Sequence, residues 1–332
     1  MAVTNHKLNI AIVAGGFSSE REISLQSGTQ IARWLDRTKY RIFPIEINTG
    51  DWVYRADNGE IVAIDKSDFT LSKDGNKIRF DFVIIAVHGH PGENGVLQSY
   101  FDLLGIRYST AGPQISALTF DKHLSKIYLE KFGIITARSV LLTRHTEYHP
   151  QQITKGLGLP LIVKPNASGS SFGVSLVKKA DELEPAIQKA FEEDKNKVLI
   201  EEYIEGTEVS CGVFYDGTEL LAFPPTEIVS KTDFFDYEAK YMGQSEEITP
   251  ARLPNSMLQQ IQETARKIYR AFLCEGIVRV DFIIKNGKTP YFLEINTVPG
   301  MSAESIFPKQ ARVKGMEMTE IYDKLIKNKL GQ

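Results

Sequence analysis

The chain has 332 residues, of which 42% are hydrophobic and 24% are charged, and its formal net charge is −3. These values are typical of a soluble globular protein with two or three domains. The slightly acidic balance excludes the overall basic field of a general nucleic-acid-binding or membrane-surface protein, and no stretch approaches the ~20 apolar residues of a membrane span.

The first third of the chain alternates predicted strands with a helix. "LNIAIVAGG" is a strand that ends in a glycine turn, and in the helix "SSEREISLQSGTQIARWL" the spacing of Ser19 and Glu22 predicts a capping box. "RIFPIEI" and the almost wholly apolar "FDFVIIAVHG" are further strands. The alternation predicts an open, mostly parallel α/β sheet. The glycines of "AGGFSSE" do not form G-x-G-x-x-G, which disfavours a nicotinamide-binding dehydrogenase.

The composition changes after "STAGPQ". A single helix is expected over "ISALTFDKHLSKIYLEKFG", with Gly133 as its C-cap. "PLIVKPNASGSSFGVSLVKK" predicts two strands joined by a glycine- and serine-rich loop, followed by the helix "ELEPAIQKAFEEDKN" and the strand "KVLIEEYI". The last third combines the strands "EVSCGVFY", "GIVRVDFII" and "YFLEIN" with the helix "SMLQQIQETARKIYRAFL". Between them, the long polar stretch "SKTDFFDYEAKYMGQSEEITPARLP" indicates a lid or binding loop.

The two cysteines bear on the compartment. Cys211 and Cys274 are far apart and fit no metal-type spacing, so we expect free thiols in a reducing environment. The start "MAVTNHKLNIAIVAGG" has no small-residue cleavage site of the kind that secretory signals carry. We therefore expect a cytoplasmic protein.

Polar side chains interrupt the two strands nearest the C-terminus. Asn-Gly in "KNGK" predicts a hairpin turn between them, in which position 281 faces 292 and position 279 faces 294. Side chains alternate along each strand, so this register gathers the polar ones on one face. The four residues are Arg279, Asp281, Glu294 and Asn296. The pattern fits either a solvated salt-bridged face or a magnesium site of hard oxygen ligands that also holds a nucleotide.

The loop "KPNASGSSFG" joins two apolar strands. Its small residues let backbone N–H groups approach an anion, and Lys164 adds a positive charge. A flexible hairpin tip is the alternative. Lys122 and the glutamates Glu201, Glu202 and Glu208 are individually typical surface residues, although a carboxylate there could accept hydrogen bonds from ribose.

Five stretches together resemble one known family: "GGFSSEREISLQSG", "VHGHPGENGVLQSYFDLLGIRYSTAG", "KPNASGSSFG", "YEAKY" and "RVDFII…YFLEINTVPGMS". They follow the order found in D-alanine–D-alanine ligases of the ATP-grasp superfamily and span nearly the whole chain. The resemblance implies an α/β chain whose C-terminal part is α+β. A Rossmann-like substrate domain over 1–114 would precede two ATP-grasp subdomains, 115–204 and 205–332, with a lid loop at about 230–250.

The resemblance also implies an ADP-forming reaction for peptidoglycan precursor synthesis. The carboxylate of a first D-alanine would attack the γ-phosphate of ATP to give an acyl phosphate, and the amine of a second D-alanine would then displace phosphate. The implied cofactors are ATP and two Mg²⁺ ions, with Mn²⁺ as an alternative. The implied partners are these small molecules and a second copy in a homodimer, with no nucleic acid and no membrane.

Site residues follow position by position from the resemblance. The catalytic ones are Glu20, Ser170, Tyr241, Arg279 and Gly300. The nucleotide contacts are Lys122, Lys164, Ser171, Glu201, Glu202, Tyr203, Glu208 and Lys240. The metal ligands are Asp281, Glu294 and Asn296, and the substrate contacts are His88 and Ser305.

Their implied roles differ. Glu20 would hold the ammonium of the first D-alanine, Arg279 and the Gly300 N–H would stabilise the oxyanion, and Ser305 would bind the second carboxylate. The family pattern is broken at Glu304, which stands where a histidine is often found. Tyr241 favours an amine acceptor over D-lactate. A ligase with D-lactate or D-serine as acceptor and a non-catalytic nucleotide-binding regulator are the alternatives.

Overall fold

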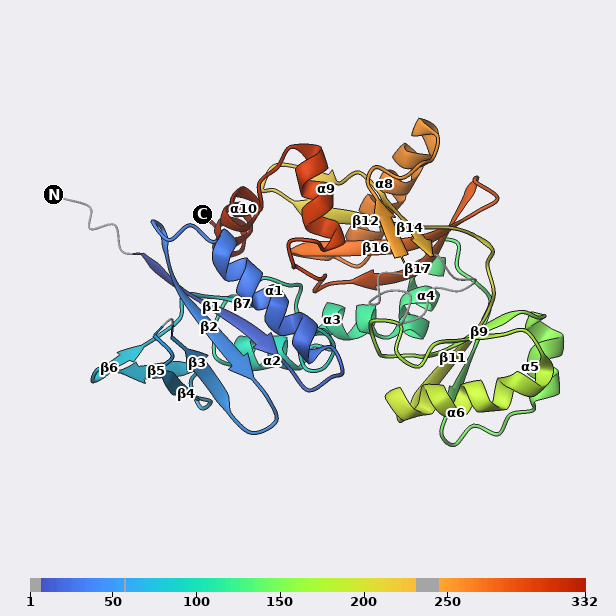
Figure 1. Ribbon diagram of the computed structural model, residues 1–332, viewed down its shortest axis with the longest axis horizontal. Coiled ribbons are helices and arrows are strands. Elements are labelled where there is room, and N and C mark those ends of the chain that lie inside the picture. The colour runs from blue at the N-terminus through green and yellow to red at the C-terminus, as the bar shows by residue number, and fades with distance from the viewer. Residues whose placement is uncertain (1–6, 57, 231–244) are drawn as a thin grey trace.

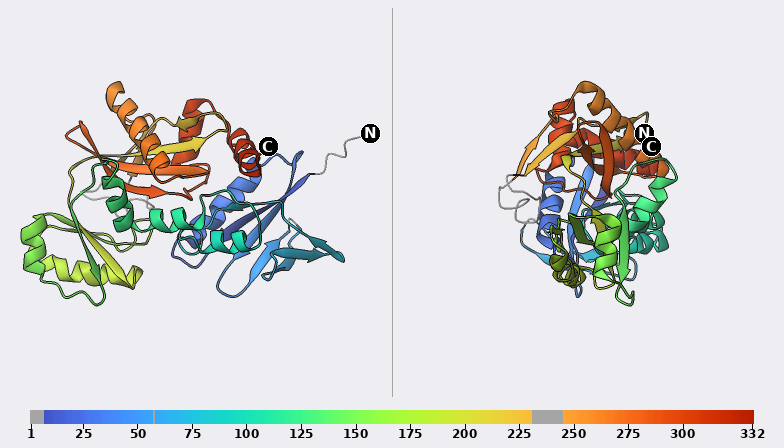
Figure 2. Two further views of the ribbon diagram at one scale, coloured as in Figure 1. Left: turned by 180° about the vertical axis from the view of Figure 1, so that it is seen from behind. Right: turned by 90° about the vertical axis from the view of Figure 1, so that its right-hand side faces the viewer.

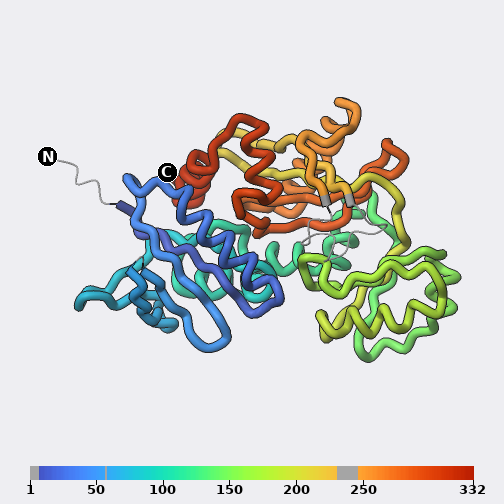
Figure 3. The backbone as a smooth tube through the Cα atoms, in the orientation of Figure 1, coloured from blue at the N-terminus to red at the C-terminus, as the bar shows by residue number. Residues whose placement is uncertain are grey.

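The computed structural model describes residues 7–56, 58–230 and 245–332. Within these ranges the strands form three sheets of seven, four and six strands. The seven-stranded sheet, in blue, lies at one end of the molecule, and the four-stranded sheet, in green to yellow, lies at the other (Figure 1). The six-stranded sheet spans the space between and above them, as the tube in Figure 3 also shows. The predicted division into domains at 114 and 204 stays a prediction.

The N-terminal sheet is mixed, so the prediction of a mostly parallel sheet is wrong for it. Its strands, in spatial order, are β6 (Asn76–Ile78), β5 (Thr70–Lys73), β4 (Ile61–Asp65), β3 (Trp52–Arg55), β2 (Tyr40–Ile47), β1 (Leu8–Gly15) and β7 (Phe82–Ile85). β1 pairs in parallel with β2 and β7, whereas the pairings from β2 to β6 are antiparallel. Strands β3 to β6 leave little signal in the sequence, because they are short and partly exposed. Asp74 and Gly75 both have positive φ, and this Asp-Gly signal marks the β5–β6 turn.

Helix α1 (Arg21–Trp34) packs on one face of this sheet and α2 (Val96–Leu103) on the other (Figure 2). The predicted capping box of Ser19 and Glu22 is wrong, because α1 begins after Glu20 and has no side-chain cap. Ser18 instead accepts the Glu20 N–H at 3.3 Å and donates to the His88 carbonyl at 3.0 Å. The side chain of Glu20 is thereby free to point away from its own helix.

The predicted helix over 115–133 is two helices, α3 (Pro113–Phe120) and α4 (Lys122–Glu130). Asp121 interrupts them, because its backbone is extended and its side chain accepts the Leu124 N–H as the N-cap of α4. Gly133 has φ +68° and closes the turn after α4. The break directs Lys122 toward the glycine- and serine-rich loop, where its Nζ donates to the Ser168 carbonyl at 2.6 Å.

The four-stranded sheet contains the predicted strand–loop–strand unit. Its order is β10 (Ser175–Val177), β9 (Leu161–Pro165), β11 (Lys197–Glu202) and β8 (Ser139–Thr143). Helices α5 (Pro150–Leu157) and α6 (Leu183–Glu193) flank it, with the short 3₁₀ turn Ala180–Glu182 before α6. The loop 166–174 therefore connects two antiparallel neighbours, as the sequence predicts.

The six-stranded sheet carries the C-terminal part of the chain. Its order is β15 (Ser245–Ile248), β14 (Thr226–Ser230), β12 (Gly206–Tyr215), β16 (Ile277–Lys285) and β17 (Thr289–Asn296), with β13 (Leu220–Ala222) also paired to β12. Its helices are α8 (Asn255–Ala271), α9 (Ile306–Lys314) and α10 (Met318–Leu330).

The β16–β17 hairpin differs from the predicted register by two residues. Asp281 faces Glu294 and Arg279 faces Asn296, not positions 292 and 294. One extra residue lies in the turn, because Lys285 pairs with Thr289, and another lies at a bulge opposite the Asp281–Phe282 junction. Beyond the bulge the shift is two, which keeps Arg279, Asp281, Glu294 and Asn296 together on one face, whereas a shift of one there would have separated the two strands' polar side chains.

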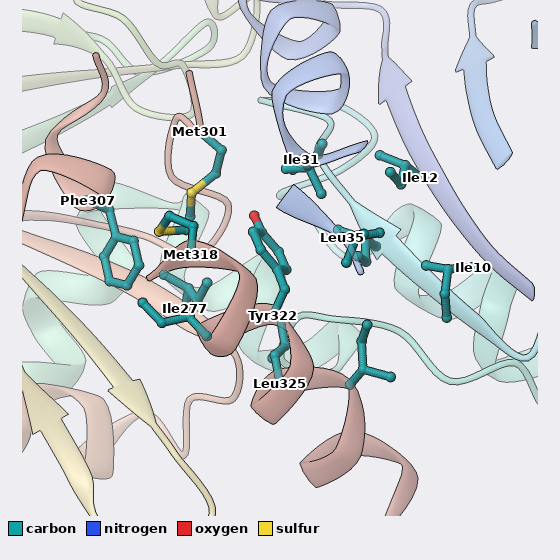
Figure 4. Close-up of a cluster of buried hydrophobic side chains, with 14 of the residues drawn as sticks. Ile10, Ile12, Ile31, Leu35, Ile277, Met301, Phe307, Met318, Tyr322 and Leu325 are labelled. Carbon is teal, nitrogen blue, oxygen red and sulfur yellow. The ribbon is translucent and has the colours of Figure 1, made fainter. Parts of the chain in front are cut away.

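One hydrophobic core joins the N-terminal and C-terminal sheets. Figure 4 shows side chains of both meeting around α10: Ile10, Ile12, Ile31, Leu35, Ile277, Met301, Phe307, Met318, Tyr322 and Leu325. The four-stranded sheet instead buries its own cluster, which includes Leu161, Val163 and Ile187. It therefore packs as a unit apart from that shared core. Among the described helices, none has the length and apolar character to cross a membrane.

Candidate active site

A cavity of about 430 Å³ opens between the four-stranded and six-stranded sheets. The glycine- and serine-rich loop and the start of α4 form one wall, and β12, β16 and β17 form the other. Eleven of the sequence-predicted site residues line it: Lys122, Lys164, Ser170, Ser171, Glu201, Glu202, Tyr203, Glu208, Arg279, Asp281 and Glu294. Residues from distant parts of the chain are thus brought together, as the resemblance implies.

The predicted acid and amide cluster forms on the inner face of the hairpin. Asp281 accepts from Arg279 Nε at 3.0 Å and from Arg279 Nη2 at 2.9 Å. It also accepts from Asn296 Nδ2 at 3.0 Å and from the hydroxyl of Ser210, a residue that the sequence analysis missed. Burial opposes the charge of Arg279, but the adjacent Asp281 outweighs it and raises the pKa of the guanidinium. Arg279 therefore remains a cation inside the protein.

Glu294 completes this cluster from β17. Its carboxylate lies 3.2 Å from Lys122 Nζ, which belongs to the opposite wall. The two carboxylates and the amide are hard oxygen donors of the kind Mg²⁺ prefers, and Asp281 and Glu294 are direct cross-strand partners. No cluster of three or more His, Cys, Asp or Glu side chains suited to a metal occurs in the described part of the chain. The donor set here has two acids, and its third oxygen comes from Asn296, so its chemistry is compatible with such an ion.

A buried ion cluster lies beside the loop. The Glu201 carboxylate contacts Lys164 Nζ at 2.6 Å and also pairs with Lys126 Nζ. Burial opposes the ionisation of Glu201, but the charges of the two lysines outweigh it and lower its pKa. Lys126 is absent from the predicted site, because "HLSKIYL" reads as an ordinary amphipathic helix. Its partner is 75 residues away in the sequence.

The two residues that follow Glu201 make their hydrogen bonds with other partners. Glu202 is turned toward Arg138, which donates from its backbone N–H at 2.9 Å and from Nε at 2.8 Å. Tyr203 donates its backbone N–H to the Pro160 carbonyl at 3.1 Å. Of these residues, Glu201 is therefore the one whose carboxylate is buried at the cavity wall.

Glu20, which directly precedes α1, reaches the glycine- and serine-rich loop. Ser170 donates a hydrogen bond to its Oε1, and both side chains are buried. The approach is close at the neighbouring residue as well, since a Cβ atom on Gly169 would lie 2.4 Å from Glu20 Oε2. Ser170 and Ser171 both have positive φ, so the loop holds non-glycine residues in a strained conformation at this contact.

Glu93 is a further acid that the sequence analysis missed. It accepts the Gly89 N–H at 2.7 Å. Burial, followed by the charge of Glu20, raises the pKa of Glu93 to about 8. A signal for it existed in "VHGHPGENG", where a glutamate follows the predicted His88 closely, but a lone acid in a glycine-rich turn is usually exposed.

His88 links the N-terminal sheet to the loop that follows β17. Its Nδ1 lies 2.8 Å from the Val298 carbonyl, which can only accept, so Nδ1 carries a proton. Its Nε2 lies 3.1 Å from Ser27 Oγ, which in turn accepts the Met301 N–H at 3.1 Å. This chain of hydrogen bonds fixes the segment around Gly300.

Ser305 lies at the start of α9, where its Oγ accepts the Ser302 N–H at 2.9 Å. A Cβ on Gly300 would sit 3.2 Å from the same hydroxyl, so these two predicted residues are neighbours. Glu304 is exposed and lies 3.6 Å from Lys309. The predicted lid residues Lys240 and Tyr241 fall outside the described residues.

Known proteins of one family match nearly the whole chain. The family model "D-ala D-ala ligase N-terminus" matches residues 9–111, and "D-ala D-ala ligase C-terminus" matches residues 128–327. The chain is 44% identical to a D-alanine–D-alanine ligase of Phocaeicola vulgatus over 97% of its own length and 99% of the relative's. It is 46% identical to one of Flavobacterium johnsoniae, with 96% and 98% coverage.

Solved structures are similar as well. D-alanyl-alanine synthetase A of Vibrio cholerae is 29% identical and superposes with a TM-score of 0.88, covering 98% of this chain and 99% of the other. The VanG D-Ala:D-Ser ligase of Enterococcus faecalis is 33% identical, with a TM-score of 0.87 and coverage of 97% and 99%. The likeness in both cases extends over all three sheets.

Proposed function

The chain belongs to the D-alanine–D-alanine ligase family, and from this premise we propose how its own side chains carry out the ligation. It is an ATP-dependent ligase that joins two D-alanine molecules in peptidoglycan synthesis. The observation that carries the proposed assignment of residues is that Lys122 meets Glu294 across the cavity, beside Arg279 and Asp281.

In the first step, a carboxylate oxygen of the first D-alanine attacks the γ-phosphorus of ATP, and the bond to the ADP oxygen breaks. Glu20 binds the ammonium group of that D-alanine, because its carboxylate is buried at the junction of α1 and the loop. Lys122 and Lys164 bind phosphate oxygens as point charges, and the N–H groups of the loop add donors. The product of the step is an acyl phosphate.

In the second step, the amine of the second D-alanine attacks the carbonyl carbon of the acyl phosphate. Negative charge develops on the carbonyl oxygen, and phosphate then leaves. Arg279 stabilises this oxyanion together with the Gly300 N–H, and such a donor contributes about 3–4 kcal/mol. Arg279 suits the task because Asp281 fixes its guanidinium with two hydrogen bonds before substrate arrives. Ser305, next to Gly300, binds the carboxylate of the second D-alanine.

Asp281, Glu294 and Asn296 would hold two Mg²⁺ ions. When bound, the ions neutralise charge on the phosphate oxygens. Arg279 and Lys122 are the cationic partners of Asp281 and Glu294 in this structure. The lid residues Lys240 and Tyr241 are proposed to close over the site, and their role rests on the resemblance alone.

A phosphate-release assay tests the function. Release should require ATP, Mg²⁺ and D-alanine together, and a lack of D-alanine dependence would contradict the proposal. Offering D-serine and D-lactate beside D-alanine, with analysis of the products, identifies the acceptor. We expect D-alanyl-D-alanine as the main product, whereas a predominant mixed dipeptide or depsipeptide would assign a different acceptor.

We also propose a homodimer. Exposed apolar side chains on the two helices that contact α3 support it: Val96 and Leu103 of α2, and Leu124 and Ile127 of α4. Sedimentation at micromolar concentration should give twice the 37.3 kDa chain mass. The proposed location is the cytoplasm, where ATP is available and where Cys211 and Cys274 stay reduced as the free thiols found here. The proposal involves no nucleic acid and no membrane.

A further inference from the structure

Lys126 is a buried lysine that the proposed ligation mechanism does not use. It lies on α4 and is 2% exposed. Its Nζ bonds Glu201 Oε1, while the other carboxylate oxygen, Oε2, contacts Lys164 Nζ at 2.6 Å. Glu201 and Lys164 line the cavity, whereas Lys126 is not among the lining residues. Lys126 therefore binds the Glu201 carboxylate on the side away from the cavity.

The cluster places two positive charges on one buried carboxylate. Burying an ammonium group is costly unless a partner of opposite charge compensates it. Burial lowers the pKa of Lys126, and the charge of Glu201 raises it in opposition. If Lys164 leaves the cluster, one lysine and one carboxylate remain as a neutral pair. Lys164 can thus move away while the Glu201 carboxylate keeps one cationic partner.

A nucleotide would cause that release. Lys164 belongs to the strand that enters the glycine- and serine-rich loop, where phosphate oxygens are proposed to bind. Transfer of its ammonium group from Glu201 to a phosphate would leave Glu201 Oε2 without its present donor. The exocyclic amine of adenine is a donor that can replace it, whereas guanine presents a carbonyl oxygen at the same position, which a carboxylate repels.

We propose that Lys126 is a positioning residue that holds Glu201 for the adenine amine once Lys164 has turned to the phosphates. Lys126 is thereby a determinant of the preference for adenine over guanine nucleotides. This inference rests on the proposed nucleotide site. The inference also couples recognition of the base to recognition of the phosphates. Lys164 must leave Glu201 before it binds the phosphates, and Glu201 then becomes available to the base.

The test compares Lys126→Met with Lys131→Met, a matched control at the exposed end of the same helix. For each, kcat/KM is measured with ATP and with GTP at saturating D-alanine. Lys126→Met should lower the ATP-to-GTP ratio by about 10–100-fold, as expected for loss of a hydrogen bond to a charged group. The KM for D-alanine should not change. Lys131→Met should match the wild type, and Lys126→Arg, which keeps the charge, should restore most of the ratio.

A purely structural Lys126 would lower both activities equally and leave the ratio unchanged, and that result would overturn the proposal. Circular dichroism confirms that each variant is folded. Should Lys126→Met not fold, Lys126→Gln replaces it, and an unchanged ratio there counts equally against the idea.

The proposed function and the inference about Lys126 can be contradicted independently of each other. A wild-type protein without D-alanine-dependent phosphate release would contradict the ligase assignment. Equilibrium binding of ADP and GDP would still report on Lys126 in that case, because it needs no turnover. Equal loss of affinity for both nucleotides in Lys126→Met would contradict the inference alone.

Discussion

Asp281 lies directly opposite Glu294 across the β16–β17 pair, and each carboxylate is bound to a cation, Arg279 for the first and Lys122 for the second. The two cations come from opposite walls of the cavity. Opposed carboxylates at this spacing repel each other unless cations separate them. The pair therefore needs either its present basic partners or bound divalent ions.

Replacing Asp281 by asparagine should weaken the proposed magnesium site. Outer-shell partners of a metal ligand are typically worth 10–100-fold in affinity, so loss of a direct ligand should cost at least about tenfold. The measurement is the Mg²⁺ concentration that gives half-maximal phosphate release at saturating ATP. Glu263→Gln, on the exposed face of α8, is the control. An unchanged Mg²⁺ requirement in Asp281→Asn would remove this residue from the metal site.

Arg279→Ala separates turnover from nucleotide binding. Its guanidinium is proposed to act on the oxyanion, so kcat should fall by roughly 10²–10³-fold. Asp281 keeps its hydrogen bonds from Ser210 and Asn296, so the face should remain assembled. Binding of ADP, followed by calorimetry, should change little. A variant that lost nucleotide affinity and kept kcat would show instead that Arg279 binds the ground state. Arg312→Ala, which removes an exposed arginine of α9, is the control for the loss of charge.

Local signals in the sequence were sufficient for several elements near the site. The strand–loop–strand unit around Lys164 is predicted because two apolar runs flank a cluster of small residues, and the structure confirms it. The Asn-Gly turn correctly places β16 beside β17. The prediction of a shared polar face is confirmed even though its register is wrong, because the extra residues in the turn and at the bulge add up to two.

Other features depend on contacts between distant segments and leave little local trace. Lys126 resembles any lysine of an amphipathic helix until β11 brings Glu201 against it. Glu93 becomes buried only when the turn after β7 folds beside Glu20. The break at Asp121 had a local signal, since aspartate is a strong N-cap, but continuous helical periodicity on both sides concealed it.

Glu93 gives the protein a stability that depends on pH. Its pKa is raised from the ordinary glutamate value of 4.5 to about 8, by burial and then by the charge of Glu20. Between these two values the folded state keeps a proton that the unfolded chain releases. The contribution of Glu93 to the free energy of unfolding is therefore full below about pH 4.5 and falls as the pH rises toward 8, by at most about 1.4 kcal/mol per pH unit.

Glu93→Gln should remove this pH dependence of the free energy of unfolding. The amide can still accept the Gly89 N–H, and it does not ionise. Relative to the wild type, the variant should gain stability between pH 5 and pH 8 in urea unfolding experiments. Glu22→Gln replaces an exposed acid on α1, and its free energy of unfolding should depend on pH as that of the wild type does. Unfolding curves of Glu93→Gln and wild type that stay parallel across this range would mean that Glu93 is ionised in the folded protein.

Gly169→Ala tests whether the contact between the loop and Glu20 serves substrate binding. A Cβ at this position would lie 2.4 to 2.7 Å from the carboxylate atoms of Glu20. No Cβ tolerates that distance, and the Glu20 carboxylate can move more easily than the backbone of the loop. The change should therefore displace the group proposed to hold the first D-alanine. We expect a KM for that D-alanine raised by about tenfold or more, as for a lost hydrogen bond to a charged group. Gly156→Ala, on α5 with no heavy atom within 4 Å, should keep wild-type kinetics, so a normal KM in Gly169→Ala would show that Glu20 holds no substrate.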